Sequence, residues 1–207
     1  MVSRVAKKLP IRDQVIEAAS RLFAARGFDA TPLQDIADEV GVTKQAVLHH
    51  FPSKEHVRKG VLESILANWR DELPRLLLSA TASDDRFDSV LDEVYRLFAA
   101  SPERARFIVR EALDRPAAAR DMLRAIAPML RGIGGYIKNG LEDRSDDIDP
   151  DAYVLHVMQM IIGAAAVAEV TTSMLGDRGQ DRYDRELARI AKASLFGRKH
   201  AKRGKPS

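Results

Sequence analysis

Apolar residues recur at helical spacing along almost the whole chain, and no segment shows the apolar–polar alternation of a β-strand. In the first such segment Val15, Ala19 and Leu22 fall on one helical face, and Gly27 marks its end. Prolines and glycines separate the later segments in the same way. The pattern predicts an all-α protein, with three short helices followed by about six longer ones.

These stops give the expected helices their residue ranges. We expect helices at residues 11–26, 32–40, 44–51, 54–74, 85–100, 102–114, 117–141, 151–175 and 180–196. Thr31 is expected to cap the second helix, with Pro32 at its first helical position. Pro74 is expected to kink or end the fourth helix, and Pro128 to kink or break the helix that contains it.

Residues 31–51 predict two short helices joined by a glycine-centred turn. Ala37 is small enough for a close helix approach, Gly41 tolerates a left-handed backbone, and Val47 packs between the helices. This is the spacing of a helix-turn-helix, which holds its second helix rigidly and leaves one face exposed. An ordinary αα-hairpin has the same spacing, so both interpretations remain open at this point.

The exposed face of the second short helix would carry side chains suited to the major groove of DNA. Lys44 can reach guanine O6 and N7, Gln45 can pair bidentately with adenine, and the Thr43 hydroxyl can donate to a phosphate. Leu48 and His49 complete this face. The helix pair therefore predicts a DNA-reading element if it is a helix-turn-helix.

Positive charge gathers at the two ends of the chain. The formal net charge of +3 divides into +3 for residues 1–60, −5 for residues 61–195 and +5 for residues 196–207. Basic ends around an acidic middle suggest that the ends meet an anionic partner. We expect residues 1–10 to form a flexible basic arm and residues 197–207 a disordered basic tail; a purely solvated role stays open for both.

The string GFDATPLQDIADEVGVTKQAVLHHFPSKE, which begins at Gly27, closely resembles the DNA-binding domain of TetR/AcrR-family transcriptional regulators. The resemblance covers residues 11–58 and implies a three-helix DNA-binding domain there. It implies that the recognition helix contacts DNA through Thr43, Lys44, Gln45 and His49. It also implies that Lys54 anchors a phosphate and that Thr31 is a phosphate contact or a helix cap.

Leu48 departs from the family pattern, which usually has a tyrosine at this position. The tyrosine hydroxyl usually reaches a phosphate, whereas leucine offers only an apolar contact to a thymine methyl group. The departure implies weaker anchoring to the DNA backbone, or anchoring that shifts to Lys44, Lys54 and the basic ends.

The resemblance further implies that residues 59–196 form a helical domain that binds a small-molecule effector and dimerises through the last two long helices. Residues 158–170 are apolar nearly all round, which favours burial on every side and hence a partner chain. Burial within one chain alone stays open. The residues that we expect to line the effector pocket, with plain core packing as the alternative for each, are Trp69, Tyr95, Phe98, Phe107, Arg110, Met122, Met129, Tyr136 and Met160.

The composition excludes several classes of chemistry. The chain has no cysteine, which rules out disulfides, cysteine nucleophiles and thiolate metal sites. The histidines do not follow the His-Glu-x-x-His spacing of a zinc site, so we expect no enzyme activity, no metal and no cofactor. The uncharged residues 152–168 fall just short of a membrane span, so we expect a buried helix, no membrane partner and a cytoplasmic protein.

The sequence therefore predicts a homodimeric regulator that binds a palindromic double-stranded DNA operator, as a repressor controlled by an unidentified small-molecule effector. One alternative is a constitutive or activating DNA-binding regulator without a small-molecule ligand. Another is an α-helical enzyme or carrier in which residues 11–58 have only a structural role.

Overall fold

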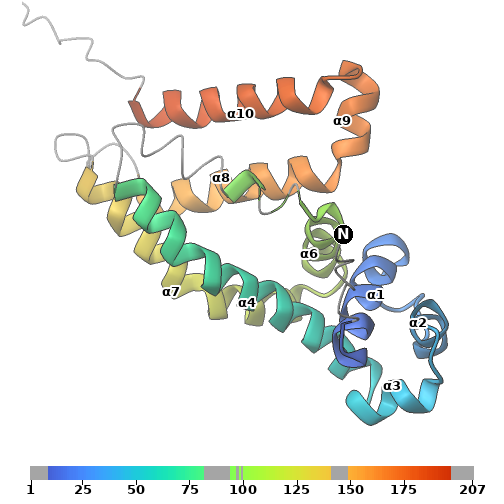
Figure 1. Ribbon diagram of the computed structural model, residues 1–207. Helices are drawn as coiled ribbons and strands as arrows, with labels where there is room; N and C mark the ends of the chain where they lie inside the picture. The colour runs from blue at the N-terminus through green and yellow to red at the C-terminus, as the bar shows by residue number, and fades with distance from the viewer. Residues whose placement is uncertain (1–8, 82–93, 97, 99, 141–148, 197–207) are drawn as a thin grey trace, which may run out of the picture. The chain divides into compact units, whose positions relative to one another are not determined.

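The computed structural model describes residues 9–81, 94–96, 98, 100–140 and 149–196. The helices are α1 (Ile11–Arg26), α2 (Leu33–Val40), α3 (Lys44–His50), α4 (Lys54–Thr81), α6 (Pro102–Asp114), α7 (Pro116–Gly140), α8 (Pro150–Ala166), α9 (Ala168–Leu175) and α10 (Gly179–Phe196) (Figure 1). No strand occurs among these residues, and the all-α prediction is confirmed. The basic tail, most of the basic arm and most of the expected helix at residues 85–100 lie outside the described residues.

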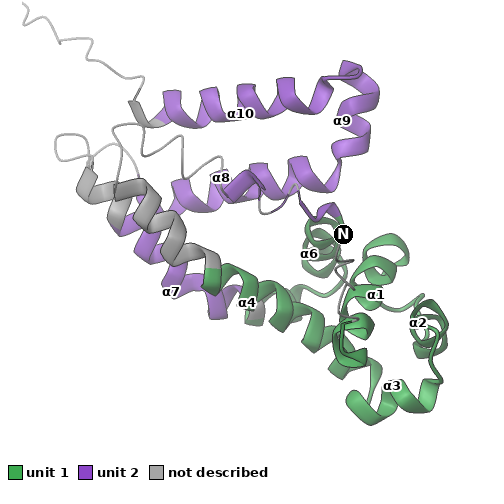
Figure 2. Cartoon of the chain, viewed as in Figure 1, with its two compact units in different colours: residues 1–73, 103–122 green, residues 74–102, 123–207 purple. Residues whose placement is uncertain are grey.

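The chain divides into two units (Figure 2). The first unit contains residues 1–73 and 103–122, and the second contains residues 74–102 and 123–207. This division differs from the linear one expected from sequence, which places the boundary at residue 58. The difference arises because α6 packs with α1 and with the start of α4, so a segment distant in sequence joins the first unit.

The core of the first unit forms where the apolar faces of α1 to α4 meet. Its fully buried side chains come from α1, α2, α3 and α4, and α6 adds Phe107, which is 1% exposed. The Phe107 ring stacks on Phe23 with 6.0 Å between the ring centroids. The helical periodicity read from the sequence is thus confirmed for these helices: the core residues on α1 to α4 include Val15, Phe23, Ile36, Val47, Val57 and Val61.

The structure decides part of three local expectations. Pro74 does not end α4, which continues to Thr81, so the kink expected there stays a prediction. Pro128 likewise lies inside α7 without breaking it, and the kink expected there also stays a prediction. The expected single helix at residues 151–175 is two helices that meet at Val167 with a bend of 73°. Hydropathy did not reveal this bend, because no glycine or proline stands at Val167.

In the second unit, α8 and α10 lie side by side in opposite directions, joined by α9 (Figure 1). The Tyr153 hydroxyl on α8 donates a hydrogen bond of 2.8 Å to the main-chain oxygen of Ala191 on α10. Asp149 caps α8 by accepting from the N–H groups of Asp151 and Ala152, with Pro150 at the first helical position. The Tyr153 hydrogen bond therefore connects α8 to α10, and the Asp149 cap fixes the start of α8.

Candidate nucleic-acid interface

The turn between α2 and α3 depends on one glycine. Gly41 has φ 75° and ψ 35°, the left-handed conformation that glycine adopts without strain. The N–H groups of Gly41 and Val42 donate to the carbonyls of Asp38 and Ala37, which closes the end of α2. Val47 on α3 is completely buried, so α3 is fixed from beneath by the residue that the sequence placed between the helices.

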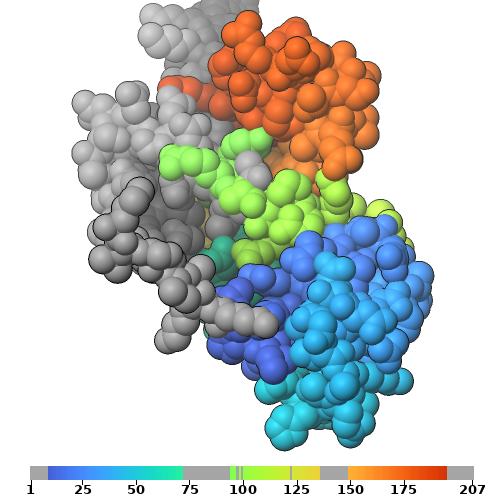
Figure 3. Space-filling view, turned by 45° about the vertical axis from the view of Figure 1, so that its right-hand side comes forward, coloured from blue at the N-terminus to red at the C-terminus, as the bar shows by residue number. Residues whose placement is uncertain are grey.

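The outer face of α3 carries the residues expected to read DNA. Thr43, Lys44, Gln45 and His49 are exposed, and Leu48 is half-buried. The Thr43 oxygen accepts a hydrogen bond of 3.1 Å from the Ala46 N–H, which leaves its hydroxyl proton available as a donor. Figure 3 shows α2 and α3, in light blue and cyan, as open surface of the first unit. The structure thus brings these five residues together on one accessible face.

Thr31 does not have the role expected of it. The helix that follows begins at Leu33 with Pro32 at the cap position, so the predicted Thr31 cap is wrong. Thr31 is completely buried, and its hydroxyl donates a 2.7 Å hydrogen bond to the Gly27 carbonyl. The threonine therefore closes the α1–α2 loop from inside, and its hydroxyl is not presented to a phosphate in this structure.

Lys54 is held within the protein. Its Nζ donates to the main-chain oxygens of Phe28 at 2.9 Å and Asp29 at 3.4 Å. The same ammonium lies 4.3 Å from the centroid of the Phe28 ring, which adds a cation–π contact. The lysine expected as a phosphate anchor thus connects the start of α4 to the α1–α2 loop.

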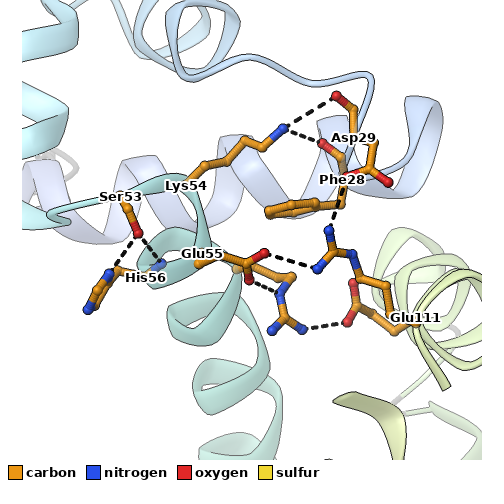
Figure 4. A network of polar contacts seen from close by, with 9 residues as sticks. Phe28, Asp29, Ser53, Lys54, Glu55, His56 and Glu111 are labelled. Carbon is orange, nitrogen blue, oxygen red and sulfur yellow. Dashed lines mark hydrogen bonds and ion pairs between the residues drawn. The ribbon is translucent and has the colours of Figure 1, made fainter. Parts of the chain in front are cut away.

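Lys54 belongs to a larger group of interacting side chains that we call the Phe28 cluster. Its members are Phe28, Asp29, Lys54, Glu55, Arg58, Glu111 and Arg115 (Figure 4). Arg115, between α6 and α7, pairs with Asp29 and Glu55 at 3.0 Å each, and its guanidinium lies 4.0 Å from the Phe28 ring centroid. The cluster therefore joins three separate segments of the first unit.

Burial and the neighbouring arginines shift the pKa values of the two glutamates in this cluster. Glu111 is 3% exposed and pairs with Arg58 at 2.7 Å. Burial raises the pKa of Glu111 above its ordinary value of 4.5, and the Arg58 charge offsets only part of that rise. Partial burial acts in the same direction on Glu55, but Arg58 and Arg115 together outweigh it and lower the pKa of Glu55. The pKa values of the two carboxylates are thus shifted in opposite directions, that of Glu111 upward and that of Glu55 downward.

Most of this cluster could not be found from the sequence. Glu55 and Arg58 lie more than 50 positions before their partners Arg115 and Glu111, and no local spacing signals that these residues meet. His50 is exposed, and its ring centroid lies 5.4 Å from that of His49. His56, on the first turn of α4, is also exposed. The surface around α3 therefore carries more imidazole groups than the sequence analysis assigned to it.

Several residues expected in an effector pocket lie in the first unit. Phe107 is part of its aromatic core, Trp69 is buried on α4, and Arg110 donates to the carbonyls of Ala24 and Ala25 at the end of α1. Phe107 and Arg110 also line a cavity of about 160 Å³, together with Phe28, Glu111 and other residues of this unit. That volume is well below the 300–1,000 Å³ typical of small-molecule sites.

The other expected pocket residues lie in the second unit or outside the described side chains. Phe98 is 2% exposed, Met129 and Met160 are half-buried, and the side chains of Met122 and Tyr136 are not described. The Tyr95 hydroxyl accepts a 3.1 Å hydrogen bond from Gln180, and burial together with a hydrogen bond to Asp184 raises the pKa of Tyr95 to about 12. The described contacts of Tyr95 are thus with the start of α10.

The described part of the chain contains no group of three His, Asp or Glu side chains placed to hold a metal ion. Among the described residues, no single helix has the length and apolar content to cross a membrane, although α8 and α9 meet that criterion when taken together across their bend.

Sequence comparison connects the helix-turn-helix with known regulators. Residues 15–61 match the family described as bacterial regulatory proteins, tetR family. The HTH-type transcriptional repressor KstR2 of Mycolicibacterium smegmatis is 36% identical over 92 residues, which are 44% of this chain and 42% of that protein. The regulator TtgR of Pseudomonas putida is 42% identical over 77 residues, 37% of this chain and 34% of that protein. The chain therefore matches less than half the length of these relatives.

Structural comparison extends over most of the chain. The fatty acid degradation regulator FadR from Bacillus halodurans superposes with a TM-score of 0.69, covering 94% of this chain and 99% of that one. Its sequence is only 16% identical, so this likeness concerns the fold. The similarity in sequence is thus concentrated at the helix-turn-helix, whereas the similarity in fold continues through the helices that follow.

Proposed function

Because the chain belongs to the tetR family of bacterial regulatory proteins, we propose that it is a DNA-binding transcriptional repressor that acts as a dimer and responds to a small molecule. The observation that carries the proposal is the accessible face of α3, where Lys44, Gln45 and His49 stand on a helix fixed by buried Val47. A rigid helix with exposed donors is what the major groove of DNA requires.

Each residue of this face has a defined task in the proposal. Lys44 and Gln45 read base edges, because a lysine reaches guanine and a glutamine pairs bidentately with adenine. Thr43 donates its hydroxyl proton to a phosphate, and Leu48 contacts a thymine methyl group. His49 adds a further polar contact at the end of the face. Thr31 has no DNA contact in this proposal, because its hydroxyl donates to the Gly27 carbonyl inside the protein.

We place the dimer interface on α8 and α10. Leu155 on α8 and Ile190 on α10 are 41% and 47% exposed, although these helices are otherwise packed against each other. Apolar residues exposed on two adjacent helices favour association with a second copy, which would bury them in a symmetric interface. A dimer would present two α3 helices to half-sites about one helical turn apart.

The effector belongs to the same proposal. A molecule that binds the protein in a state unsuited to the operator weakens DNA binding, and DNA must then weaken effector binding by the same factor. A panel of metabolites is first screened for an increase in the melting temperature of the full chain. Each hit is then titrated against free and operator-bound protein. Equal affinities in the two titrations contradict control by that effector, and the absence of any hit favours a regulator without a small-molecule ligand.

DNA binding itself is tested with a fluorescent random duplex at several salt concentrations. We expect binding that weakens steeply with salt, because each neutralised phosphate contributes a slope of about −0.9 to log K against log salt. The rival proposal, an α-helical enzyme or carrier, predicts no such binding. A flat or undetectable salt response is therefore the result that favours the rival.

A further inference from the structure

The first two turns of α4 present three faces with different surroundings. Lys54, Glu55 and Arg58 point into the Phe28 cluster. Val57 and Val61 are buried in the core of the first unit. The remaining face is exposed and begins with His56, which is followed one turn later by Lys59, 71% exposed at its side chain. His56 is therefore the first residue on the exposed face of α4, and of the residues on that face it lies nearest to α3 in the sequence.

Lys54 is already committed to contacts within the protein. Its ammonium binds two main-chain carbonyls and the face of the Phe28 ring, as described above. A lysine that turned outward to a phosphate would leave the Phe28 carbonyl with only the Thr31 N–H as a donor and would remove a charge from the cluster. This exchange costs free energy, because the hydrogen bonds to two main-chain carbonyls and the cation–π contact with Phe28 are lost. Lys54 is therefore suited to holding the α1–α2 loop.

The His56 ring is held in a fixed orientation. Ser53 Oγ lies 2.8 Å from His56 Nδ1 and accepts the His56 main-chain N–H at 3.3 Å. The contact with Ser53 engages Nδ1 and leaves Nε2 free for another partner; in the tautomer in which the serine hydroxyl donates to Nδ1, the proton of the neutral imidazole is on Nε2. Figure 4 shows the ring pointing away from the Phe28 cluster. In that tautomer His56 offers an oriented N–H donor on the outer side of α4.

The charges around His56 favour an anionic partner. No acidic residue occurs between Glu39 and Glu55, a stretch that contains the whole of α3. Glu55, the immediate neighbour of His56, is paired with Arg58 and Arg115 inside the cluster. The exposed imidazole therefore follows, in the sequence, a helix without carboxylates, and the carboxylate of its neighbour Glu55 is neutralised by two arginines.

We propose that His56 is the residue on α4 that contacts a backbone phosphate of the operator, and that Lys54 serves instead to hold the Phe28 cluster. The proposal rests on the proposed DNA binding and adds a residue that the family resemblance did not supply. It predicts that the two positions respond differently to substitution: His56 controls affinity for DNA of any sequence, and Lys54 controls the stability of the first unit.

The test uses the full chain and a pair of matched histidine variants. His56→Gln keeps an N–H donor near the position of Nε2, whereas His56→Asn places its amide near Nδ1 and falls short. We expect His56→Asn and His56→Ala to bind selected and random duplexes about tenfold more weakly, as for loss of one hydrogen bond to a charged group. His56→Gln should retain most of the affinity. A methylphosphonate scan of the duplex should locate one phosphate at which neutralisation removes the difference between wild type and His56→Ala.

Lys54→Met and Lys59→Met provide the second comparison, since both remove one lysine charge from the same helix. Lys54→Met should lower the melting temperature and leave the salt slope of DNA binding unchanged, whereas Lys59→Met should leave the melting temperature unchanged. If the wild-type chain binds DNA and His56→Ala binds it equally well, this inference is wrong while the proposed function stands. The same holds if Lys54→Met has normal stability but a flatter salt slope of DNA binding. Absence of DNA binding by the wild-type chain overturns the proposed function, and this inference with it.

Discussion

At the scale of single residues, the exposed face of α3 combines side chains that can bind base edges with one apolar side chain, Leu48. Lys44 and Gln45 have the donors that base edges require, and both are exposed on α3. Leu48, between them and His49, is half-buried and has no group that can bind a phosphate. The backbone anchor that a tyrosine would supply at this position is therefore missing from α3.

Leu48→Tyr tests whether this missing anchor limits affinity. The introduced hydroxyl can donate to a phosphate, so we expect tighter binding to specific and random duplexes alike, by about fivefold to tenfold for one added hydrogen bond. The measurement is the dissociation constant on both duplexes at the same salt concentration. Tighter binding to one sequence alone would show that residue 48 reads a base and would contradict the role given to the leucine.

At the scale of helices and loops, the Phe28 cluster links α4, the α1–α2 loop and the α6–α7 junction through ion pairs, of which the Arg58–Glu111 pair is the most buried. Substitution of Arg58 should destabilise the cluster most, because its side chain is only 14% exposed and pairs with both Glu55 and Glu111. A buried carboxylate left without its cation is strongly unfavourable. The stability of the first unit should therefore depend on Arg58 more than on any exposed basic residue of α4.

We expect Arg58→Met to lower the free energy of unfolding by about 3–5 kcal/mol at pH 7. Burial already raises the pKa of Glu111 above 4.5, and loss of the Arg58 charge raises it further. A raised carboxyl pKa means that the folded state takes up a proton more readily than the unfolded chain. The deficit should therefore shrink as the pH falls toward 4.5, in urea titrations at several pH values. A deficit that stays constant with pH, or an equal loss in the exposed control Lys59→Met, would contradict this account.

At two glycines of the second unit, substitution by alanine should change the stability of the protein in opposite directions. A Cβ added at Gly179 would lie 2.8 Å from Leu175 Cβ and 3.0 Å from the Thr171 carbonyl oxygen, so α9 and α10 approach too closely for alanine. We expect Gly179→Ala to destabilise the protein by about 1–3 kcal/mol. Gly132, inside α7, has nothing within 4 Å of such a Cβ, so Gly132→Ala should stabilise by about 0.8–1 kcal/mol. Urea denaturation of both variants checks the signs; a shared sign would refute the packing argument.

These elements also show how far the sequence could predict the structure. The ends of α1 and α6, and the turn at Gly41, follow from local chemistry: a stop at Gly27, Pro102 at a first helical position, and a left-handed glycine. The accessible face of α3 followed from the same spacing and the family resemblance. The Phe28 cluster could not be predicted, because the ion pairs that Glu111 and Arg115 make with α4 join residues more than 50 positions apart. The burial of Thr31 was missed for a different reason: its hydrogen bond to Gly27 is local, but a threonine just before Pro32 also suits a helix cap.

At the scale of the whole molecule, α4 and α7 each continue from one unit into the other. The boundary at residues 73 and 74 lies inside α4, and the boundary at residues 122 and 123 lies inside α7. The proposed repressor needs such continuity, because effector binding and DNA binding can be linked only if both bias a shared element. Dimerisation is the other requirement at this scale, since one α3 helix reads only one half of a palindromic operator.

Ile190→Asp tests the dimer interface proposed on α8 and α10. A charge buried in an apolar interface is costly, so we expect the variant to be monomeric by light scattering and to bind a palindromic duplex at least tenfold more weakly. Leu123→Asp is the matched control, because Leu123 is 43% exposed on α7 and lies outside the proposed interface. A dimeric Ile190→Asp protein, or a monomeric Leu123→Asp protein, would place the interface elsewhere.

The central claim is that this chain reads a specific DNA sequence as a dimer. Selection from randomised duplex DNA, followed by the salt dependence of binding to the winning sequence, tests it most directly. We expect a palindromic winner with half-sites about one helical turn apart and a steep loss of affinity with salt. Gln45→Ala should then relax the preference at particular base pairs, by about 1–3 kcal/mol. No enrichment above random DNA would contradict the account, and so would a winner without two-fold symmetry.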